Sequence, residues 1–294
     1  MTQHRFDAKK FRVKEGDAIK LSKIATKAGD ELNKKTDGVE ALENDIGTLQ
    51  AAQERLFASN SRSLLIILQG MDTSGKDGTI RHVFQGVNPQ GCRVYGFKAP
   101  NDDELGHHFL WRPMRFLPTK GMISIFNRSY YEEVLVVRVH PAFLKPQNLM
   151  PYDNLDSLWR RRYEEIRVFE KTMVESGTSV LKFYLHISRD EQRKRLLERL
   201  EKPDKHWKFN PRDLEERKFW NDYEQAFEDA LTATSTKHAP WFVIPADDKW
   251  YARAAVADLI AEHLESLDLQ YPEVSPEETA KYAAYAQSLR DERS

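Results

Sequence analysis

The sequence predicts an α/β protein of three layers, in which helices cover both faces of a parallel five-stranded sheet. Short continuous apolar runs recur along the chain, and helix-compatible stretches separate them. Such a run is typical of a strand buried on both faces, and buried strands that alternate with helices are typical of parallel sheets. The expected strands are residues 63–69, 93–97, 122–126, 180–187 and 241–245.

The segment before the first strand has a different composition. Residues 1–60 are rich in Lys, Glu, Asp and Ala, and Leu42, Ile46, Leu49 and Leu56 are spaced for an amphipathic helix. We therefore expect an N-terminal helical extension that packs against a main domain.

The main domain is expected to span residues 61–265. Within it, residues from about 189 to 218 form a highly charged helical excursion with a Pro-Asp break, which we interpret as a lid. The remaining residues, 266–294, are acidic and polar, and Pro272 and Pro276 interrupt them. They are predicted to be a polar C-terminal tail without chemistry.

The composition limits the class of protein. The 294 residues are 40% hydrophobic and 31% charged with a formal net charge of -1, which indicates a globular protein and not a general nucleic-acid binder. One cysteine, Cys92, excludes an intramolecular disulfide and fits a reducing compartment. No apolar run reaches the roughly 20 residues that span a bilayer, and the N-terminus lacks the hydrophobic region of a secretory signal. These observations predict a cytoplasmic protein that binds neither membrane nor nucleic acid.

A phosphate-binding motif begins where the first expected strand ends. Residues 70–76 match G-x-x-x-x-G-K, and the residues that follow can continue as a helix. In this context backbone N–H groups converge on phosphate oxygens, glycines allow close approach, and Lys76 supplies a positive charge. A chance glycine-rich turn is the alternative interpretation. The residues predicted to bind phosphate or nucleotide here are Gly70, Thr73, Ser74, Gly75, Lys76, Asp77 and Gly78.

The motif departs from the usual pattern at Asp77, which replaces the Ser or Thr that normally helps to hold Mg²⁺. Asp72 and Asp77 offer hard oxygen ligands instead, so both are candidate metal ligands. Asp72 is expected either to bind the metal or to orient the phosphoryl acceptor. For Asp77, a favourable charge at the helix N-terminus is an equal alternative. His107 and His108 lack further ligand residues at metal-binding spacing and are assigned no metal.

Polar residues also follow the third expected strand, at the sheet edge where α/β proteins bind ligands. Asn127 and Arg128 come directly after this strand, Glu132 follows, and Arg138 lies further along. All four are candidate phosphate- or nucleotide-binding residues, and both arginines can form two hydrogen bonds to a phosphate. A plain surface cation is the alternative for each arginine. Asn127 stands where P-loop enzymes commonly carry a metal-binding Asp, which shifts that role toward Asp72.

The predicted lid carries a local excess of cations, with eight Lys or Arg and five Asp or Glu over residues 189–208. Several of them follow one another at helical spacing, so the segment can track a long polyanion. A solvated helix face with ordinary charge pairs is the equal alternative for each residue. The candidate polyanion-binding residues are Arg189, Arg193, Arg195, Arg199, Lys205 and Lys208.

Four sequence blocks together resemble the polyphosphate kinase 2 family. They are QGMDTSGKDGTIRHVFQGVNPQGCRV, FNRSYYEEVLVVRVHP, EQRKRLLERLEKPDKHWKF and TSTKHAPWFVIPADDKWYAR. The resemblance covers about residues 10–265 and is strongest to members that act on AMP as well as ADP. It implies a P-loop kinase-like fold with a helical lid, Mg²⁺ as cofactor, no covalent phospho-enzyme, and a homo-oligomer, either a dimer or a tetramer.

The same resemblance implies Mg²⁺-dependent phosphoryl transfer between inorganic polyphosphate and AMP or ADP, with guanine nucleotides as an open alternative to adenine nucleotides. By position, Asp72 and Lys76 resemble the catalytic residues of the Walker A motif, and Asn127 with Arg128 occupies the Walker B position. We therefore expect Asp72, Lys76 and Arg128 to be catalytic. The Asn in place of Asp puts direct metal binding at Asn127 in doubt.

Two other functions remain open from the sequence. An ATP-dependent nucleoside monophosphate kinase uses a similar scaffold, but the missing P-loop hydroxyl and the four blocks weigh against it. A non-catalytic polyphosphate-binding protein fits the basic lid, but it is hard to reconcile with an intact Lys76 and Asp72.

Overall fold

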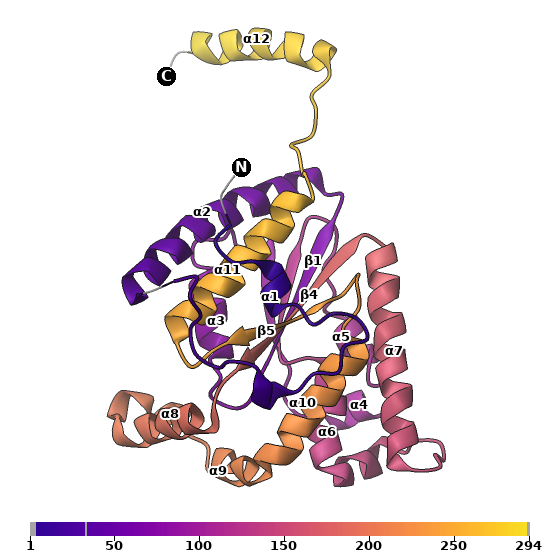
Figure 1. Cartoon of the computed structure of the whole chain (residues 1–294). Helices are drawn as coiled ribbons and strands as arrows, with labels where there is room; N and C mark the ends of the chain where they lie inside the picture. Colours follow the sequence, from indigo (N-terminus) through magenta and orange to yellow (C-terminus); the bar gives the residue numbers. More distant parts are fainter. Residues whose placement is uncertain (1–3, 33, 293–294) are drawn as a thin grey trace.

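The central sheet is parallel throughout (Figure 1). The computed structural model describes residues 4–32 and 34–292, and its strands lie in the order β2-β3-β1-β4-β5. The strands are β1 (Ser63–Gln69), β2 (Cys92–Gly96), β3 (Ile123–Asn127), β4 (Thr178–His186) and β5 (Trp241–Pro245). The five-stranded parallel sheet predicted from the apolar runs is therefore confirmed.

Helices cover both faces of the sheet and make the three predicted layers (Figure 1). On one face α2 (Lys35–Ser59) packs against α11 (Lys249–Ser266), which also packs against α3 (Lys76–Val83). On the other face α7 (Leu155–Glu175) packs against β4 and against α10 (Trp220–Thr234). The remaining helices, with η for 3-10 helices, are α1 (Ala8–Phe11), η1 (Leu21–Lys23), α4 (Asp102–Leu105), α5 (Trp111–Met114), η2 (Tyr130–Val134), α6 (Val136–Val139), η3 (Pro141–Gln147), α8 (Arg189–Glu201), η4 (Pro203–Lys208), α9 (Arg212–Glu216), η5 (Arg217–Phe219) and α12 (Pro276–Asp291).

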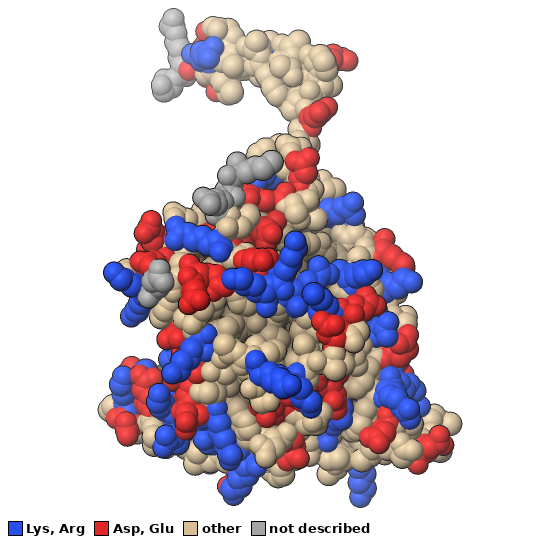
Figure 2. Space-filling view, in the orientation of Figure 1, with Lys and Arg blue, Asp and Glu red and all other residues tan. Residues whose placement is uncertain are grey.

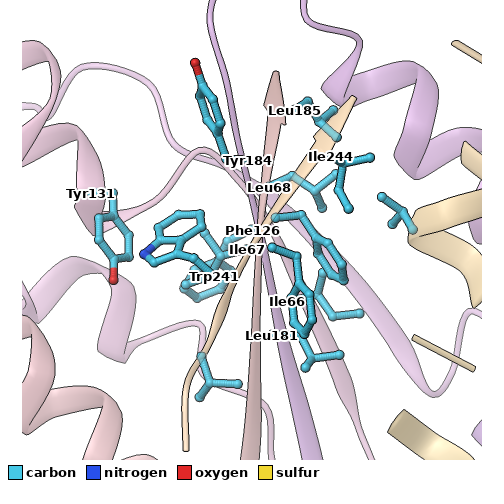
Figure 3. Close-up of a cluster of buried hydrophobic side chains, with 14 of the residues drawn as sticks. Ile66, Ile67, Leu68, Phe126, Tyr131, Leu181, Tyr184, Leu185, Trp241 and Ile244 are labelled. Carbon is cyan, nitrogen blue, oxygen red and sulfur yellow. The ribbon is translucent and has the colours of Figure 1, made fainter. Parts of the chain in front are cut away.

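The central strand β1 is buried along its whole length. It pairs with β3 on one side and with β4 on the other, and helices shield both of its faces, so its residues need no polar alternation. Figure 3 shows Ile66, Ile67 and Leu68 of this strand among apolar side chains of β3, β4 and β5. Removal of these side chains from water is the main favourable contribution that holds the layers together.

The amphipathic helix expected between residues 1 and 60 is α2, and it packs along α11. Leu49 and Leu56 are buried in this contact, whereas Leu42 and Ile46 are half-buried at its border. The helix ends at Asn60, whose left-handed backbone turns the chain into β1.

The residues before α2 also belong to the core. Phe6, Phe11 and Val13 are buried, and Arg12 forms an antiparallel bridge with Phe242 of β5. The N-terminal segment therefore covers the β5 edge of the sheet, where an open edge would expose unpaired backbone groups. The predicted domain boundaries after residues 60 and 265 stay predictions.

The chain leaves the body of the protein after α11. In Figure 1, α12 stands apart from the sheet and its helices, and none of its described residues is buried. The Ser275 and Glu278 side chains form a capping box at its start, so the predicted polar tail contains a regular helix. Among the described residues, no helix combines the length and the hydrophobicity that crossing a bilayer requires.

A buried ion pair joins β4 to the helices of the second face. Lys182 Nζ lies 2.6 Å from Glu170 Oε2, and both side chains are 0% exposed. Lys182 also donates to the Thr234 carbonyl oxygen at 2.8 Å, and the hydroxyls of Tyr130 and Tyr131 donate to Glu170 at 2.9 and 2.8 Å. Burial lowers the pKa of Lys182. Because the two tyrosines follow β3, this network anchors the segment that comes directly after that strand.

We expect Lys182→Ala to lower the free energy of unfolding by about 3–5 kcal/mol, because the Glu170 carboxylate stays buried without its cation. Urea unfolding followed by circular dichroism measures the change. Lys171→Ala is the control, since Lys171 is exposed on α7 and lies 3.7 Å from Glu175; we expect it to cost about 0.5 kcal/mol or less. Equal losses in the two variants would contradict the role of the buried pair.

Candidate functional site

The predicted phosphate loop joins β1 to α3, and its two glycines are required by the backbone. Gly70 has φ +155°, and a Cβ there would lie 2.8 Å from the Leu185 carbonyl oxygen and 2.6 Å from Ser74 Oγ. Gly75 has φ +106°, a conformation that residues with side chains rarely adopt. Glycine at these two positions therefore allows the chain to make this tight turn.

The Lys76 side chain lies buried inside this loop. Its Nζ donates to the carbonyl oxygens of Gly70 at 2.7 Å and Met71 at 3.2 Å. Burial, together with the positive charge of Arg128, lowers the pKa of Lys76 to about 8, although Asp72 acts in the opposite direction. An anion in the loop would compete with the carbonyls for the ammonium group and favour its charged form.

Arg128 reaches the loop from the end of β3. The register of β1 and β3 places Leu68 opposite Asn127, and the Arg128 backbone N–H donates to the Leu68 carbonyl oxygen at 3.1 Å. Arg128 has φ +63°, which is uncommon for a residue with a side chain. Its guanidinium pairs with Glu132 at 3.0 Å and Asp72 at 2.6 Å, and these carboxylates raise the pKa of Arg128. The structure thus brings Asp72 and Arg128 into direct contact.

A second contact between β3 and the loop joins the two residues that depart from the usual motif. Asn127 Nδ2 donates to Asp77 Oδ1 at the first turn of α3. The described residues contain no group of three or more His, Cys, Asp or Glu side chains arranged to hold a metal alone. The two carboxylates of Asp72 and Asp77 beside a phosphate loop nevertheless suit a hard divalent cation that takes its other ligands from phosphate and water.

The other predicted loop residues are contiguous with Lys76. Thr73 has φ +64°, and its Oγ1 is buried without a hydrogen-bond partner among the described residues. Ser74 is buried and accepts a hydrogen bond from Lys76 at 3.4 Å. Gly78 lies in the first turn of α3. Their contacts with phosphate stay predictions.

Helix α8, the first helix of the predicted lid, is fixed to the outside of the loop. Arg195 is buried, and its guanidinium donates to the carbonyl oxygens of Thr73 and Ser74 at 2.9 and 3.0 Å and to that of Ala246 at 2.6 Å. Gln192 Nε2 donates to the Asp72 carbonyl oxygen at 3.1 Å. Backbone carbonyls thus occupy the donors of Arg195 in this structure, and its contact with a polyanion stays a prediction.

The other predicted lid cations fall into two groups. Arg199 pairs with Asp213 at 2.9 Å, and Lys205 pairs with Glu198 at 2.6 Å. The exposed members are Arg189, Arg193 and Lys208, of which Arg193 lies 3.5 Å from Asp190. Figure 2 shows basic and acidic side chains intermixed over α8 and α9. Contacts between these cations and a polyanion stay predictions.

Arg138 lies on α6 and is bound to two partners away from the loop. Its guanidinium donates to the Tyr163 hydroxyl at 2.6 Å and pairs with Asp229. It lines neither of the two pockets described below. The structure therefore does not bring Arg138 together with Lys76 and Arg128, as the phosphate-binding prediction required.

Two pockets meet at the site, and Glu132 lines both. The first is bounded by residues 69–72 of the loop, by Arg128, and by Trp220 and Tyr223 of α10. It therefore contains the contact between Arg128 and the loop. The shared carboxylate places the two pockets next to each other.

The second pocket is larger and consists mainly of residues that the sequence did not single out. Its lining combines aromatic side chains with cations and carboxylates: Phe97, Lys98, Glu104, His107, His108, Phe109, Arg112, Glu132, Glu133, Arg161, Arg162 and Glu165. Arg112 pairs with Glu104 at 3.1 Å and Arg162 with Glu133 at 3.0 Å, whereas Lys98 forms no ion pair among the described residues. Next to it, His107 stacks on Trp111 with ring centroids 3.9 Å apart. Such a lining suits a ligand that combines a flat base with an anionic group. The run HHFLWR at residues 107–112 is the sequence signal that could have indicated it, although no pocket was predicted from it.

Comparisons with known proteins agree with this geometry. The profile of the polyphosphate kinase 2 (PPK2) family matches residues 32–272. The chain is 49% identical to an ADP-polyphosphate phosphotransferase of Rhodopseudomonas palustris over 91% of this chain and 93% of that protein. It is also 49% identical to an AMP/ADP-polyphosphate phosphotransferase of Meiothermus ruber, over 76% of this chain and 80% of that protein. The crystal structure of polyphosphate kinase 2 from Arthrobacter aurescens superposes with a TM-score of 0.87 at 40% identity and covers 95% and 96% of the two chains.

We expect phosphate binding in the loop to take up a proton above pH 8. The pKa of Lys76 is about 8 in the free protein, and bound phosphate raises it by stabilising the ammonium form. At pH 8.5, binding of inorganic tripolyphosphate should therefore add up to about 0.8 proton per site. Calorimetry in buffers of different ionisation enthalpy measures this number.

Lys76→Met is the control for this experiment, because it removes the titrating amine and leaves only the protonation change of the ligand. Equal proton exchange by the two proteins would contradict the pKa assigned to Lys76.

Proposed function

This chain belongs to the polyphosphate kinase 2 family, and we propose that it moves a phosphoryl group between inorganic polyphosphate and AMP or ADP. The observation that carries the proposal is the meeting of two pockets at Glu132. One pocket is lined by Gly70, Met71 and Asp72 of the phosphate loop, and the other combines aromatic walls with cations and carboxylates. Direct transfer between two bound phosphates requires such an arrangement, because the reacting groups must be held next to each other.

In this proposal the loop holds the phosphate donor. Backbone N–H groups at the start of α3 point toward phosphate oxygens, as in other phosphate loops. Lys76 leaves the loop carbonyls that it contacts in the free protein and neutralises charge that develops during transfer. The unpartnered hydroxyl of Thr73 donates to a phosphate oxygen.

The second pocket holds the acceptor nucleotide. Phe97 and Phe109 supply apolar surface for the base, and Lys98, which forms no ion pair among the described residues, supplies positive charge for the phosphates. The named activities of the two relatives support AMP and ADP as acceptors. This pocket also disfavours a purely polyphosphate-binding function, because inorganic polyphosphate has no apolar group that could pack against its aromatic side chains.

Arg128 acts between the two substrates. Asp72 and Glu132 hold its guanidinium in place, so little reorganisation is needed when charge develops on the transferring group. An acceptor phosphate oxygen attacks the terminal phosphorus, the bond to the bridging oxygen breaks, and the shortened polyphosphate leaves with the electron pair. No covalent intermediate with the protein is required.

We assign Mg²⁺ to Asp72 and Asp77, directly or through water. When bound, the ion neutralises phosphate oxygens and lowers their repulsion toward the acceptor. Assembly into a dimer or tetramer and a cytoplasmic location stay predictions.

With long-chain polyphosphate and Mg²⁺, we expect the protein to convert ADP to ATP and AMP to ADP without added ATP. Lys76→Ala should lower turnover at least ~100-fold, equivalent to about 3 kcal/mol, because it removes the cation that neutralises the transferring group. Product chromatography measures turnover, and circular dichroism checks the fold. A strict requirement for ATP as donor would favour a nucleoside monophosphate kinase, and near-normal turnover of Lys76→Ala would contradict its catalytic role.

Asp72→Asn should lower turnover by about 100-fold or more and shift its Mg²⁺ dependence to higher concentration, because an amide is a weaker metal ligand than a carboxylate. The measurement is initial rate against Mg²⁺ concentration. Asp17→Asn, which changes an exposed carboxylate outside the site, should behave like the wild type. An unchanged Mg²⁺ response in Asp72→Asn would transfer the metal role to Asp77.

A further inference from the structure

One buried arginine joins three segments that enclose the second pocket. Arg162 lies on α7 and is 2% exposed. Its Nη1 donates to the Glu133 carbonyl oxygen at 2.7 Å and to Glu133 Oε2 at 3.0 Å, and its Nη2 donates to Gln147 Oε1 at 2.5 Å. Gln147 Nε2 donates in turn to Glu133 Oε2 at 2.9 Å. The three side chains therefore form a closed triangle of hydrogen bonds between α7, η2 and η3.

The guanidinium of Arg162 also contacts an aromatic wall of the pocket. Its central carbon lies 5.3 Å from the ring centroid of Phe109 and 5.6 Å from that of Trp159. Both distances are within the range of cation–π attraction. Because a guanidinium is planar, its edge can donate hydrogen bonds while its faces pack against rings. One side chain thus holds both the triangle and the ring of Phe109.

The Glu133 corner of the triangle leads to the reacting groups. Glu133 follows Glu132 in η2, and Glu132 lines both pockets and pairs with Arg128 at 3.0 Å. A shift of Glu133 would therefore move the carboxylate that holds the Arg128 guanidinium in place.

The Gln147 corner leads to the opposite wall of the pocket. Gln147 is the last residue of η3, and Leu149 and Met150, which follow it directly, line the pocket. The contacts of Arg162 therefore fix this wall as well as the aromatic wall.

The burial of this cation is unfavourable by itself. Burial lowers the pKa of Arg162, and Arg161 acts in the same direction, whereas Glu133 raises it. A buried charge requires a partner of opposite charge and a full set of hydrogen bonds, and these requirements restrict its geometry. The triangle meets them in one arrangement of the three segments.

We propose that Arg162 is a positioning residue for the acceptor nucleotide. It sets the shape of the second pocket through Phe109, Glu133 and Gln147, and it does not contact the reacting atoms. The inference rests on the proposed function, because this is the pocket in which we place AMP or ADP. A displaced wall loses contacts with the base, so the residue acts on acceptor binding and not on donor binding.

Arg162→Lys tests the inference, because lysine keeps the positive charge but lacks the planar group that donates in two directions. We expect the KM for ADP and the dissociation constant for AMP to rise at least ~10-fold, while the KM for long-chain polyphosphate changes by less than ~2-fold. Initial rates with each substrate varied in turn give the KM values, and titration calorimetry gives the dissociation constant. A merely structural role would lower the fraction of active protein, which lowers kcat and leaves both KM values unchanged.

A second variant removes one corner of the triangle at a half-buried position. Gln147→Ala leaves the pair of Arg162 and Glu133 intact, and we expect it to raise the KM for ADP about 3-fold. If Arg162→Lys does not fold, as checked by circular dichroism, this variant decides, and a wild-type KM for ADP in it overturns the inference.

Arg167→Lys is the matched control, since Arg167 lies on the same helix and its side chain is 44% exposed. It should have wild-type KM values for both substrates. An unchanged KM for ADP in Arg162→Lys overturns the inference, as do equal increases for ADP and polyphosphate or an equal effect in Arg167→Lys.

Binding of AMP is measured without a donor, which separates the two proposals. A wild-type protein that binds AMP more tightly than Arg162→Lys does, but transfers no phosphoryl group from polyphosphate, overturns the proposed function alone. Normal transfer by the wild type together with equal AMP affinity in the two proteins overturns the inference alone.

Discussion

The register between β1 and β3 determines where the chemistry of this protein takes place. Pairing of Leu68 with Asn127 sets the end of β3 beside the phosphate loop, so that Arg128 reaches Asp72 and Asn127 reaches Asp77. A shift of one residue would send these side chains to the opposite face of the sheet. The left-handed backbone of Arg128 is unfavourable by itself, and its ion pairs and its backbone hydrogen bond to Leu68 offset that cost.

The loop is then fixed from two sides. On one side the segment after β3 is anchored through Tyr131 to the buried pair of Glu170 and Lys182. On the other side Arg195 binds the loop carbonyls and joins them to the segment after β5. Groups held in this way need little rearrangement when charge develops in a transition state, which is the main means by which phosphoryl transfer is accelerated.

A protein with a formal net charge of -1 can act on a polyanion because its charges are distributed unevenly. Figure 2 shows acidic and basic side chains intermixed over the visible face, where most charges neutralise one another. What distinguishes the surroundings of the loop is a group of cations, Arg81, Lys249 and the half-buried Arg253, that form no ion pair with any residue the structure describes. Local pairing, and not overall charge, thus decides which surface attracts phosphate.

The sequence by itself determined the sheet, the phosphate loop and the family, because these depend on neighbouring residues: continuous apolar runs form buried strands, and Gly70 and Gly75 allow one tight turn. Only the tertiary structure decided what each cation does, since its partners come from distant parts of the chain. Arg195 is bound to carbonyls of the loop and Arg138 to Asp229, and the contacts with phosphate predicted for both stay predictions. The second pocket was missed for the same reason, because it is assembled from several separate segments.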